Sequence, residues 1–283
     1  MKRRDTYRKI LYGLAAAGIF LCLFLLSYRE RSPETRQEVQ VVVFGDSVYG
    51  NVRDESSIPG LLGGLLGKTV YNAAFGGTCA SRQDDGGRLD YSGDSLSFAA
   101  LAKAVYAGDF GVQQTIRPTQ DVTYYFVSAI DGLESIDFSA VETVIIGYGL
   151  NDYYTGAPLD NEADAMDEST FAGALRKSLT ALRSVNPDMR LVLVTPTYNW
   201  LLEGRLTCEE YNAGYGILED YVETEIRVAE ELGVEIIDLY HDFFPHETWE
   251  DWELSTFDGL HPNEETRVLM AERIAEYLKG EVK

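Results

Sequence analysis

Cysteine and histidine are scarce in this chain. Its 283 residues include three cysteines, of which Cys22 lies in an apolar stretch near the N-terminus. Cys79 and Cys208 could pair, but nothing in the sequence places them close together. We therefore predict free thiols in preference to a single disulfide. The chain has only three imidazoles: His241, His246 and His261.

Basic side chains are also few outside the N-terminal region. The chain has 24 Lys and Arg against 46 Asp and Glu, and residues 1–37 hold eight of the basic and three of the acidic ones. Residues 38–283 therefore hold 16 basic and 43 acidic side chains, a net charge of −27. Such a charge repels nucleic acids and anionic lipids, so we expect neither as the substrate. Most of this charge is typical of a solvated surface.

Long uncharged runs are absent apart from one, residues 10–28, which follows a basic tail at 1–9. Nineteen residues are enough to cross a hydrocarbon core of ~30 Å as a helix. The run lacks the small residues that precede a signal-peptide cleavage site. We predict a transmembrane anchor with the tail in the cytoplasm, a tether at 29–38, and a domain at 39–283 outside the cytoplasm. Cleavage of the run, which would give a secreted protein, is the alternative.

Short apolar runs alternate with helical patterns along the rest of the chain. Strands are predicted at Val41–Val43, Thr69–Ala74, Val141–Gly147, Arg190–Thr195 and Val234–Leu239. Helices are predicted at Ser57–Leu66, Leu96–Tyr106, Glu168–Val185, Thr207–Leu232 and Asn263–Leu278. This alternation indicates an α/β domain in which helices cover both faces of a parallel sheet. No internal repeat is visible.

A long connection separates the second and third predicted strands. It spans about residues 79–140, and within it 122–130 could be either helix or strand. Insertions of this length are often lids or substrate-binding elements. A structural excursion that covers a sheet edge is the other interpretation.

A serine follows the first predicted strand directly. The run of three valines ends in Phe44-Gly45-Asp46-Ser47, and Gly and Asp favour a turn at this point. Ser47 is therefore predicted on a tight bend at the carboxyl end of a strand, where open α/β sheets place their active sites. It is a candidate nucleophile if a base and oxyanion donors occur elsewhere in the chain.

Candidates for those groups lie after later strands or just before the last predicted helix. Asp258 precedes His261 by three residues, so its carboxylate could fold back through a turn and orient the imidazole. Asn151 follows the third strand, where its amide could donate to an oxyanion beside Ser47. The N–H of Gly77, or of the adjacent Gly76, could do the same after the second strand.

Taken together, these residues resemble the SGNH (GDSL-type) hydrolase family of esterases and lipases. The matching blocks are Phe44-Gly45-Asp46-Ser47, Asn72-Ala73-Ala74-Phe75-Gly76-Gly77, Gly149-Leu150-Asn151-Asp152 and Asp258-Gly259-Leu260-His261. The resemblance covers roughly residues 39–280 and implies a three-layer α/β/α, flavodoxin-like fold with five parallel strands and no cofactor or metal. One departure is Val48, where the family usually has Leu or Ile.

The resemblance also implies roles for individual residues. Ser47 would be the nucleophile, His261 the base and Asp258 its orienting partner. The oxyanion hole would consist of Ser47, Gly77 and Asn151. The implied activity is that of a serine esterase working through an acyl-enzyme, and the predicted extracytoplasmic position favours an O-acetylated glycan of the cell envelope as substrate.

Several alternatives remain at this point. A lipid or a thioester could be the substrate within the same family. A metal-dependent hydrolase could use the ligands offered by His241, Asp242 and His246. A non-catalytic surface protein could keep the fold to bind glycan, although binding alone does not need a serine, a histidine, an aspartate and an asparagine together.

Overall fold

The structure is a computed structural model that describes residues 38–83, 93–117, 123–241 and 243–281. The predicted anchor at 10–28 and its flanking tail lie outside the described residues. Among the helices that the structure describes, none is both long and apolar enough to span a membrane.

A five-stranded parallel sheet forms the centre of the domain, with the strand order β2-β1-β3-β4-β7. Its strands are β1 (Val41–Gly45), β2 (Val70–Asn72), β3 (Thr143–Gly147), β4 (Arg190–Val194) and β7 (Glu235–Ile237). The register aligns Gly45 with Gly147, so β1 and β3 end side by side. This sheet confirms the prediction of five parallel strands in sequence positions close to those expected.

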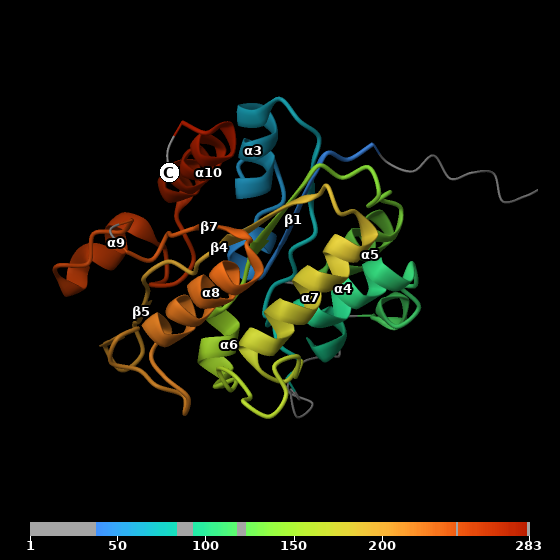
Figure 1. The fold of residues 1–283 in the computed structure, drawn as a ribbon. Coiled ribbons are helices and arrows are strands. Elements are labelled where there is room, and N and C mark those ends of the chain that lie inside the picture. The colour runs from blue at the N-terminus through green and yellow to red at the C-terminus, as the bar shows by residue number, and fades with distance from the viewer. Residues whose placement is uncertain (1–37, 84–92, 118–122, 242, 282–283) are drawn as a thin grey trace, which may run out of the picture. The chain divides into compact units, whose positions relative to one another are not determined.

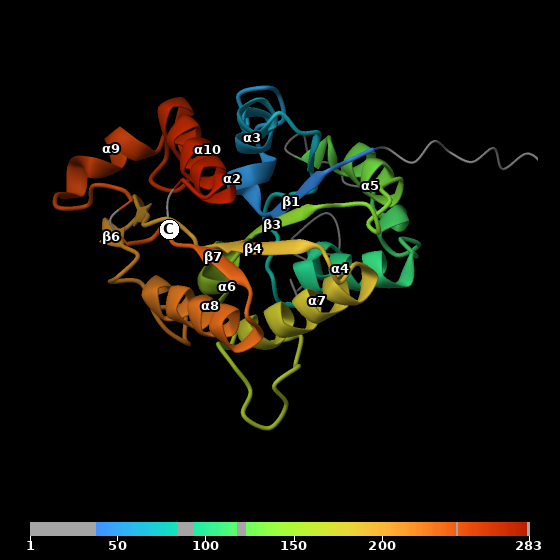
Figure 2. The ribbon, with the colours of Figure 1, turned by 45° about the horizontal axis from the view of Figure 1, so that its top comes forward.

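Helices cover both faces of the sheet, as Figure 1 and Figure 2 show. One layer contains α4 (Phe98–Ala107), α5 (Phe126–Glu134), α6 (Leu150–Thr155), α7 (Phe171–Val185) and α8 (Leu218–Leu232). The other contains α2 (Ser47–Gly50), α3 (Ile58–Leu66) and α10 (Glu264–Lys279). The predicted three-layer α/β/α architecture is therefore confirmed.

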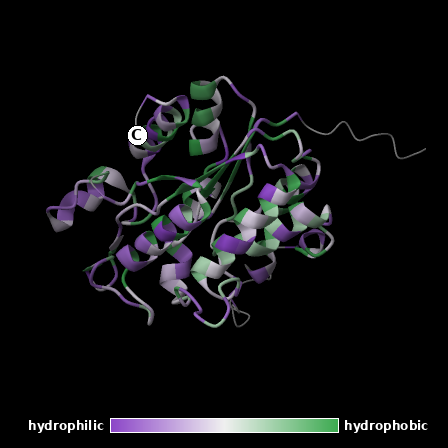
Figure 3. Ribbon diagram, viewed as in Figure 1, coloured by the Kyte–Doolittle hydropathy of each residue, from purple (hydrophilic) through white to green (hydrophobic). Residues whose placement is uncertain are grey.

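Successive side chains of a strand point to opposite faces of the sheet, so one strand packs against both helix layers. In β1, Val42 and Phe44 enter the core beneath α4 and α7, whereas Val41 and Val43 enter the core beneath α3 and α10. A strand buried on both faces needs an uninterrupted apolar run, which is why β1 reads as consecutive valines. Figure 3 shows this hydrophobic centre, with polar and apolar residues mixed on α7 and α8.

The long connection at 79–140 contributes helices to the first layer. Phe98 and Leu101 of α4 are fully buried, and α4 packs along α7. Residues 126–134 form α5, which answers the question of helix or strand for most of 122–130. The described part of the connection thus belongs to the packed body of the domain. Its short 3₁₀ turns are η1 (Gly93–Leu96) and η2 (Gln113–Thr115).

The predicted helix over 207–232 is wrong over 207–217. Thr207 is the last residue of a small antiparallel hairpin built from β5 (Trp200–Leu201) and β6 (Leu206–Thr207), and turns and irregular backbone follow it. The N–H and hydroxyl of Thr207 do donate to Glu210, but this pair closes a turn after the hairpin and caps no helix. Gly214 and Gly216 then adopt φ values of 136° and 152°, which a helix does not allow, so α8 begins only at Leu218.

Candidate active site

The turn that carries Ser47 begins where β1 ends. Asp46 caps the short helix α2, and its Oδ1 accepts the Val48 N–H at 2.9 Å. Ser47 is therefore the first helical residue, and its own N–H lies in the turn that has no intrahelical acceptor. A Cβ at Gly45 would stand 2.8 Å from Cδ2 of Tyr49, so this position needs glycine. The result is a tight strand-to-helix bend with a half-buried serine at its apex.

The turn that carries His261 lies between the short helix α9 (Trp252–Ser255) and α10. The Nδ1 atom of His261 lies 2.7 Å from Oδ2 of Asp258, and the other carboxylate oxygen accepts the His261 N–H at 2.7 Å. The Nε2 atom lies 2.9 Å from Oγ of Ser47. Burial opposes ionisation of Asp258, but the hydrogen bonds from His261 outweigh it and lower the pKa of this carboxyl. The Ser47 hydroxyl, the His261 imidazole and the ionised Asp258 carboxylate thus form a continuous chain of hydrogen-bond contacts.

The hairpin β5-β6 supports this turn. The N–H of Trp200 donates to the carbonyl of Gly259 at 2.8 Å. Gly259 has a φ of 85°, and a Cβ there would overlap the carbonyl oxygen of Trp200. Its N–H donates to the hydroxyl of Thr256 at 2.9 Å. The base is therefore held by contacts from outside its own loop.

An aromatic ring covers one side of the base. Phe257 is 61% exposed and stacks on the His261 imidazole, with ring centroids 5.6 Å apart and planes 15° apart. Leu202, at the tip of the hairpin, is also exposed. Both apolar side chains are exposed beside the loop that carries His261.

Asn151 and the two glycines approach Ser47 from neighbouring segments. Asn151 is the second residue of α6, and its Nδ2 donates to the carbonyl of Thr78 at 3.1 Å. That bond uses one of the two amide hydrogens and leaves the other for a ligand. A Cβ at Gly76 would stand 3.7 Å from Cβ of Ser47, which places this turn beside the serine.

The structure distinguishes between the two glycines. The N–H of Gly76 donates to the Tyr125 hydroxyl at 2.9 Å. Gly77 is exposed and has a φ of 76°, and none of the described residues accepts its N–H. We therefore favour Gly77 over Gly76 as the candidate oxyanion donor.

Asp152 supports the loop that follows, a role that the sequence did not reveal. It is fully buried and accepts the N–H groups of Ala80 at 2.8 Å and Ser81 at 2.9 Å, together with the Ser81 hydroxyl. Burial raises the pKa of Asp152, and these hydrogen bonds oppose the shift. The one sequence feature that could have pointed to Asp152 is its position next to Asn151 in the third block.

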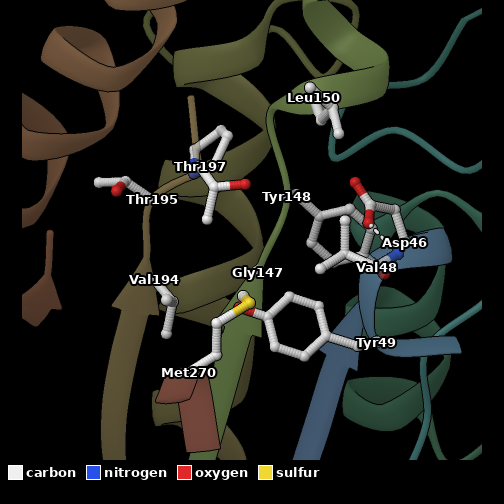
Figure 4. Close-up of a pocket in the computed structure, with 11 residues that line it drawn as sticks. Asp46, Val48, Tyr49, Gly147, Tyr148, Leu150, Val194, Thr195, Thr197 and Met270 are labelled. Atoms are coloured by element: carbon white, nitrogen blue, oxygen red, sulfur yellow. Dashed lines mark hydrogen bonds between the residues drawn. The ribbon is translucent and has the colours of Figure 1, made fainter. Parts of the chain in front are cut away.

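A pocket lies behind the nucleophile turn, at the carboxyl ends of β3 and β4 (Figure 4). Tyr49 packs its ring over Gly147, where any Cβ would overlap the ring. Asp46 and Val48 line the pocket, but Ser47 and His261 do not. We therefore infer that the residues lining this pocket support the Ser47 turn and that the pocket is not the substrate-binding site.

The two described histidines of the alternative metal site have separate partners. His241 pairs with Asp238, whose Oδ2 lies 2.7 Å from its Nδ1. His246 stacks on Tyr198 and bonds to the Phe244 carbonyl, while Asp242 lies outside the described residues. Across the described ranges, no group of three or more His, Cys, Asp or Glu side chains is arranged to hold a metal ion.

The two described cysteines are free and buried, as the sequence predicted. Burial raises the pKa of the Cys208 thiol to about 12 and that of Cys79 well above its usual range. Thiols held in the neutral form are poor nucleophiles, so neither competes with Ser47 as the reactive group of this region.

A serine, a histidine and an aspartate in series at the carboxyl edge of this sheet form the arrangement expected for the SGNH class of hydrolases. The sequence model of the GDSL-like lipase/acylhydrolase family matches residues 43–267, which include all four blocks. The chain therefore belongs to this family of hydrolases.

Solved structures show the same fold at low sequence identity. A possible lipase from Chitinophaga pinensis is 16% identical with a TM-score of 0.56, over 86% of this chain and 98% of that one. A carbohydrate acetylesterase from Sinorhizobium meliloti is 16% identical with a TM-score of 0.51, over 86% and 99%. A family two carbohydrate esterase from Clostridium thermocellum, solved with cellohexaose, is 16% identical with a TM-score of 0.51, over 87% and 65%. The comparison with curated proteins gives no match.

Proposed function

We propose that this protein is a serine esterase that hydrolyses ester bonds through an acyl-enzyme intermediate. The observation that carries the proposal is the continuous relay from Ser47 Oγ through His261 to Asp258, with contacts of 2.9 and 2.7 Å. A serine hydroxyl is a weak nucleophile until an adjacent base takes its proton. Membership of the family supports the same chemistry.

The steps follow from the positions of the groups. His261 takes the proton of Ser47 as the oxygen attacks the ester carbonyl, and Asp258 stabilises the imidazolium that forms. The N–H groups of Ser47 and Gly77 and the amide of Asn151 donate to the oxyanion. His261 then protonates the departing alcohol. A water molecule, deprotonated by His261, attacks the acyl-enzyme and releases the acid.

The substrate that we propose is a short-chain or O-acetyl ester of a cell-envelope or extracellular glycan. The acidic body disfavours anionic lipids, whereas it leaves a neutral acylated sugar unaffected. The exposed ring of Phe257 beside the base offers a face on which a sugar could stack. Carbohydrate esterases among the structures that share the fold are consistent with this substrate class.

Hydrolysis of nitrophenyl esters of graded chain length tests the reaction and the acyl preference together. We expect protein that starts at Val39 to hydrolyse the acetyl ester fastest, and to release acetate from an O-acetylated oligosaccharide. A maximum at long chains, or faster cleavage of a lysophospholipid or a thioester, would replace the glycan with those substrates. Absence of hydrolysis together with absence of Ser47 labelling by a fluorophosphonate would indicate a non-catalytic glycan-binding protein.

We also propose that residues 10–28 anchor the domain to a membrane and leave it outside the cytoplasm. The support is the uncharged run itself, which follows a basic tail. The full-length protein should stay in the membrane fraction after carbonate or high salt, while protein that starts at Val39 should be soluble. A mature N-terminus between residues 25 and 40, found by mass spectrometry, would instead show a cleaved and secreted protein.

A further inference from the structure

We propose that Tyr125 is a positioning residue for the oxyanion hole, acting through the backbone of Gly76. The inference rests on the proposed esterase function. Tyr125 lies in the long connection at 79–140, 78 residues beyond Ser47, and belongs to none of the four blocks. Its hydroxyl accepts the N–H of Gly76 at 2.9 Å, immediately before the candidate donor Gly77.

The Tyr125 ring is fixed within the core. The residue is 4% exposed, and its ring lies against Phe75 with centroids 6.5 Å apart and against Phe126 at 4.8 Å. Phe75 directly precedes the two glycines, so ring and hydroxyl hold consecutive residues of the same loop. Packing of the ring alone would not require a hydroxyl at this point.

Arg53 ties the same ring to the segment that carries the nucleophile. Its guanidinium lies 4.4 Å from the centroid of the Tyr125 ring. Its two terminal nitrogens donate to the carbonyls of Ala74 at 3.1 Å and Asn72 at 2.6 Å. Since residue 53 lies only six positions after Ser47, the serine turn and the glycine turn are held to each other through this contact.

The diglycine makes such a support necessary. Glycine has the widest backbone freedom of any residue, so Gly76 and Gly77 do not hold an N–H in one direction by themselves. An oxyanion donor stabilises a transition state only if it already points to the developing charge. The Tyr125 hydroxyl fixes the Phe75–Gly76 peptide, so only the φ and ψ angles of Gly76 lie between a fixed peptide and the peptide that carries the Gly77 N–H.

Tyr125→Phe tests this role, because it removes the hydroxyl and keeps the ring. We expect kcat for a nitrophenyl acetate to fall about 10-fold and KM to stay within about twofold of the wild-type value. The reason is that an oriented Gly77 N–H stabilises the transition state and not the bound substrate. The melting temperature should stay close to that of the wild type. The matched control is Tyr124→Phe, a neighbouring tyrosine that is 74% exposed and should keep wild-type kcat.

Two further measurements make the test specific. Inactivation by a fluorophosphonate should slow in the same ratio as kcat, because its phosphoryl oxygen enters the same hole. Arg53→Lys, which cannot bridge both carbonyls while stacking on the ring, should lower kcat in the same direction. The inference is overturned if Tyr125→Phe keeps the wild-type kcat. It is also overturned if the loss of kcat comes with a lower melting temperature or is equalled by Tyr124→Phe. In either case an inactive Ser47→Ala still supports the esterase function. A wild-type protein without hydrolysis overturns both.

Discussion

The Nε2 atom of His261 lies 2.9 Å from Oγ of Ser47, although 214 residues separate the two in the chain. Ser47 follows β1 at the carboxyl edge of the parallel sheet, and the loop between α9 and α10 brings His261 to it. A second Asp–His turn, Asp238 with His241, has the same 2.7 Å contact, but its Nε2 atom lies 3.9 Å from Oε1 of Glu219. The contact with Ser47, and not the Asp–His pair itself, is therefore the ground on which we propose His261 as the base.

This pair of turns gives a controlled test of the base. Ser47→Ala and His261→Ala should each lower kcat/KM for a short-chain ester by more than about 10³-fold, since nucleophile and base act as a unit. His241→Ala is the matched control and should keep near wild-type activity. Steady-state kinetics and thermal melts of the three variants decide the matter. Comparable losses in His241→Ala and His261→Ala would mean that our choice of base is wrong.

Replacement of Asn151 tests the side-chain oxyanion donor. Asn151→Ala should lower kcat by roughly 10²–10³-fold with little change in KM, because the amide acts on charge that develops in the transition state. Asn151→Asp, similar in shape but without the amide hydrogens, should lose as much. If instead KM rises while kcat holds, Asn151 contacts the bound substrate and not the oxyanion.

Removal of the Asp152 carboxylate should mainly affect stability. Asp152→Ala leaves the buried N–H groups of Ala80 and Ser81 without their acceptor, which costs about 3 kcal/mol of unfolding free energy. Chemical denaturation measures this loss, and Asp188→Ala, an exposed carboxylate, serves as the control. Equal stability of the two variants would show that Asp152 does not hold the loop.

Asp46 gives the protein a specific pH dependence. Burial raises the pKa of this carboxyl from 3.8 to about 7. Between these values the folded protein retains a proton that the unfolded chain releases, so the free energy of unfolding should fall as pH rises from about 4 to 7. Asp46→Asn keeps an oxygen for the Val48 N–H but cannot ionise. The free energy of unfolding of the wild type should therefore fall relative to that of this variant by up to about 1.4 kcal/mol per pH unit across that range. If the free energies of unfolding of the two proteins change in parallel with pH, Asp46 does not have the raised pKa.

The strands and the bend that carries Ser47 could be predicted because local signals define them. An uninterrupted valine run has few alternatives to a buried strand, and Gly45 and Asp46 mark the bend that follows. The helix over 207–232 failed for a local reason of another kind. The Thr207–Glu210 pair has the residues of a helix cap, and only the backbone angles at Gly214 and Gly216 show that no helix follows.

Long-range contacts account for what the sequence could not predict. Tyr125 meets Gly76 across 49 residues, and Asp152 meets Ser81 across 71. No periodicity or motif joins such pairs, because their meeting depends on how α5 and α6 pack. The choice of Gly77 over Gly76 likewise depends on the Tyr125 hydroxyl, which occupies the N–H of Gly76.

The contact between Trp200 and Gly259 bears on how the substrate range of this enzyme could be altered. The hairpin borders the loop that carries His261, so it is a natural target for laboratory evolution toward larger or smaller substrates. Its first residue, however, donates to the loop that holds the base, and Gly259 leaves no room for a side chain beneath it. Most substitutions keep that backbone N–H, but the Trp200 side chain is only 2% exposed, so a library that varies position 200 would leave a cavity beside this loop and lose turnover before it gained selectivity. Diversity is better introduced at 203–205, in the exposed loop between the two strands, because Leu202 packs against Gly259.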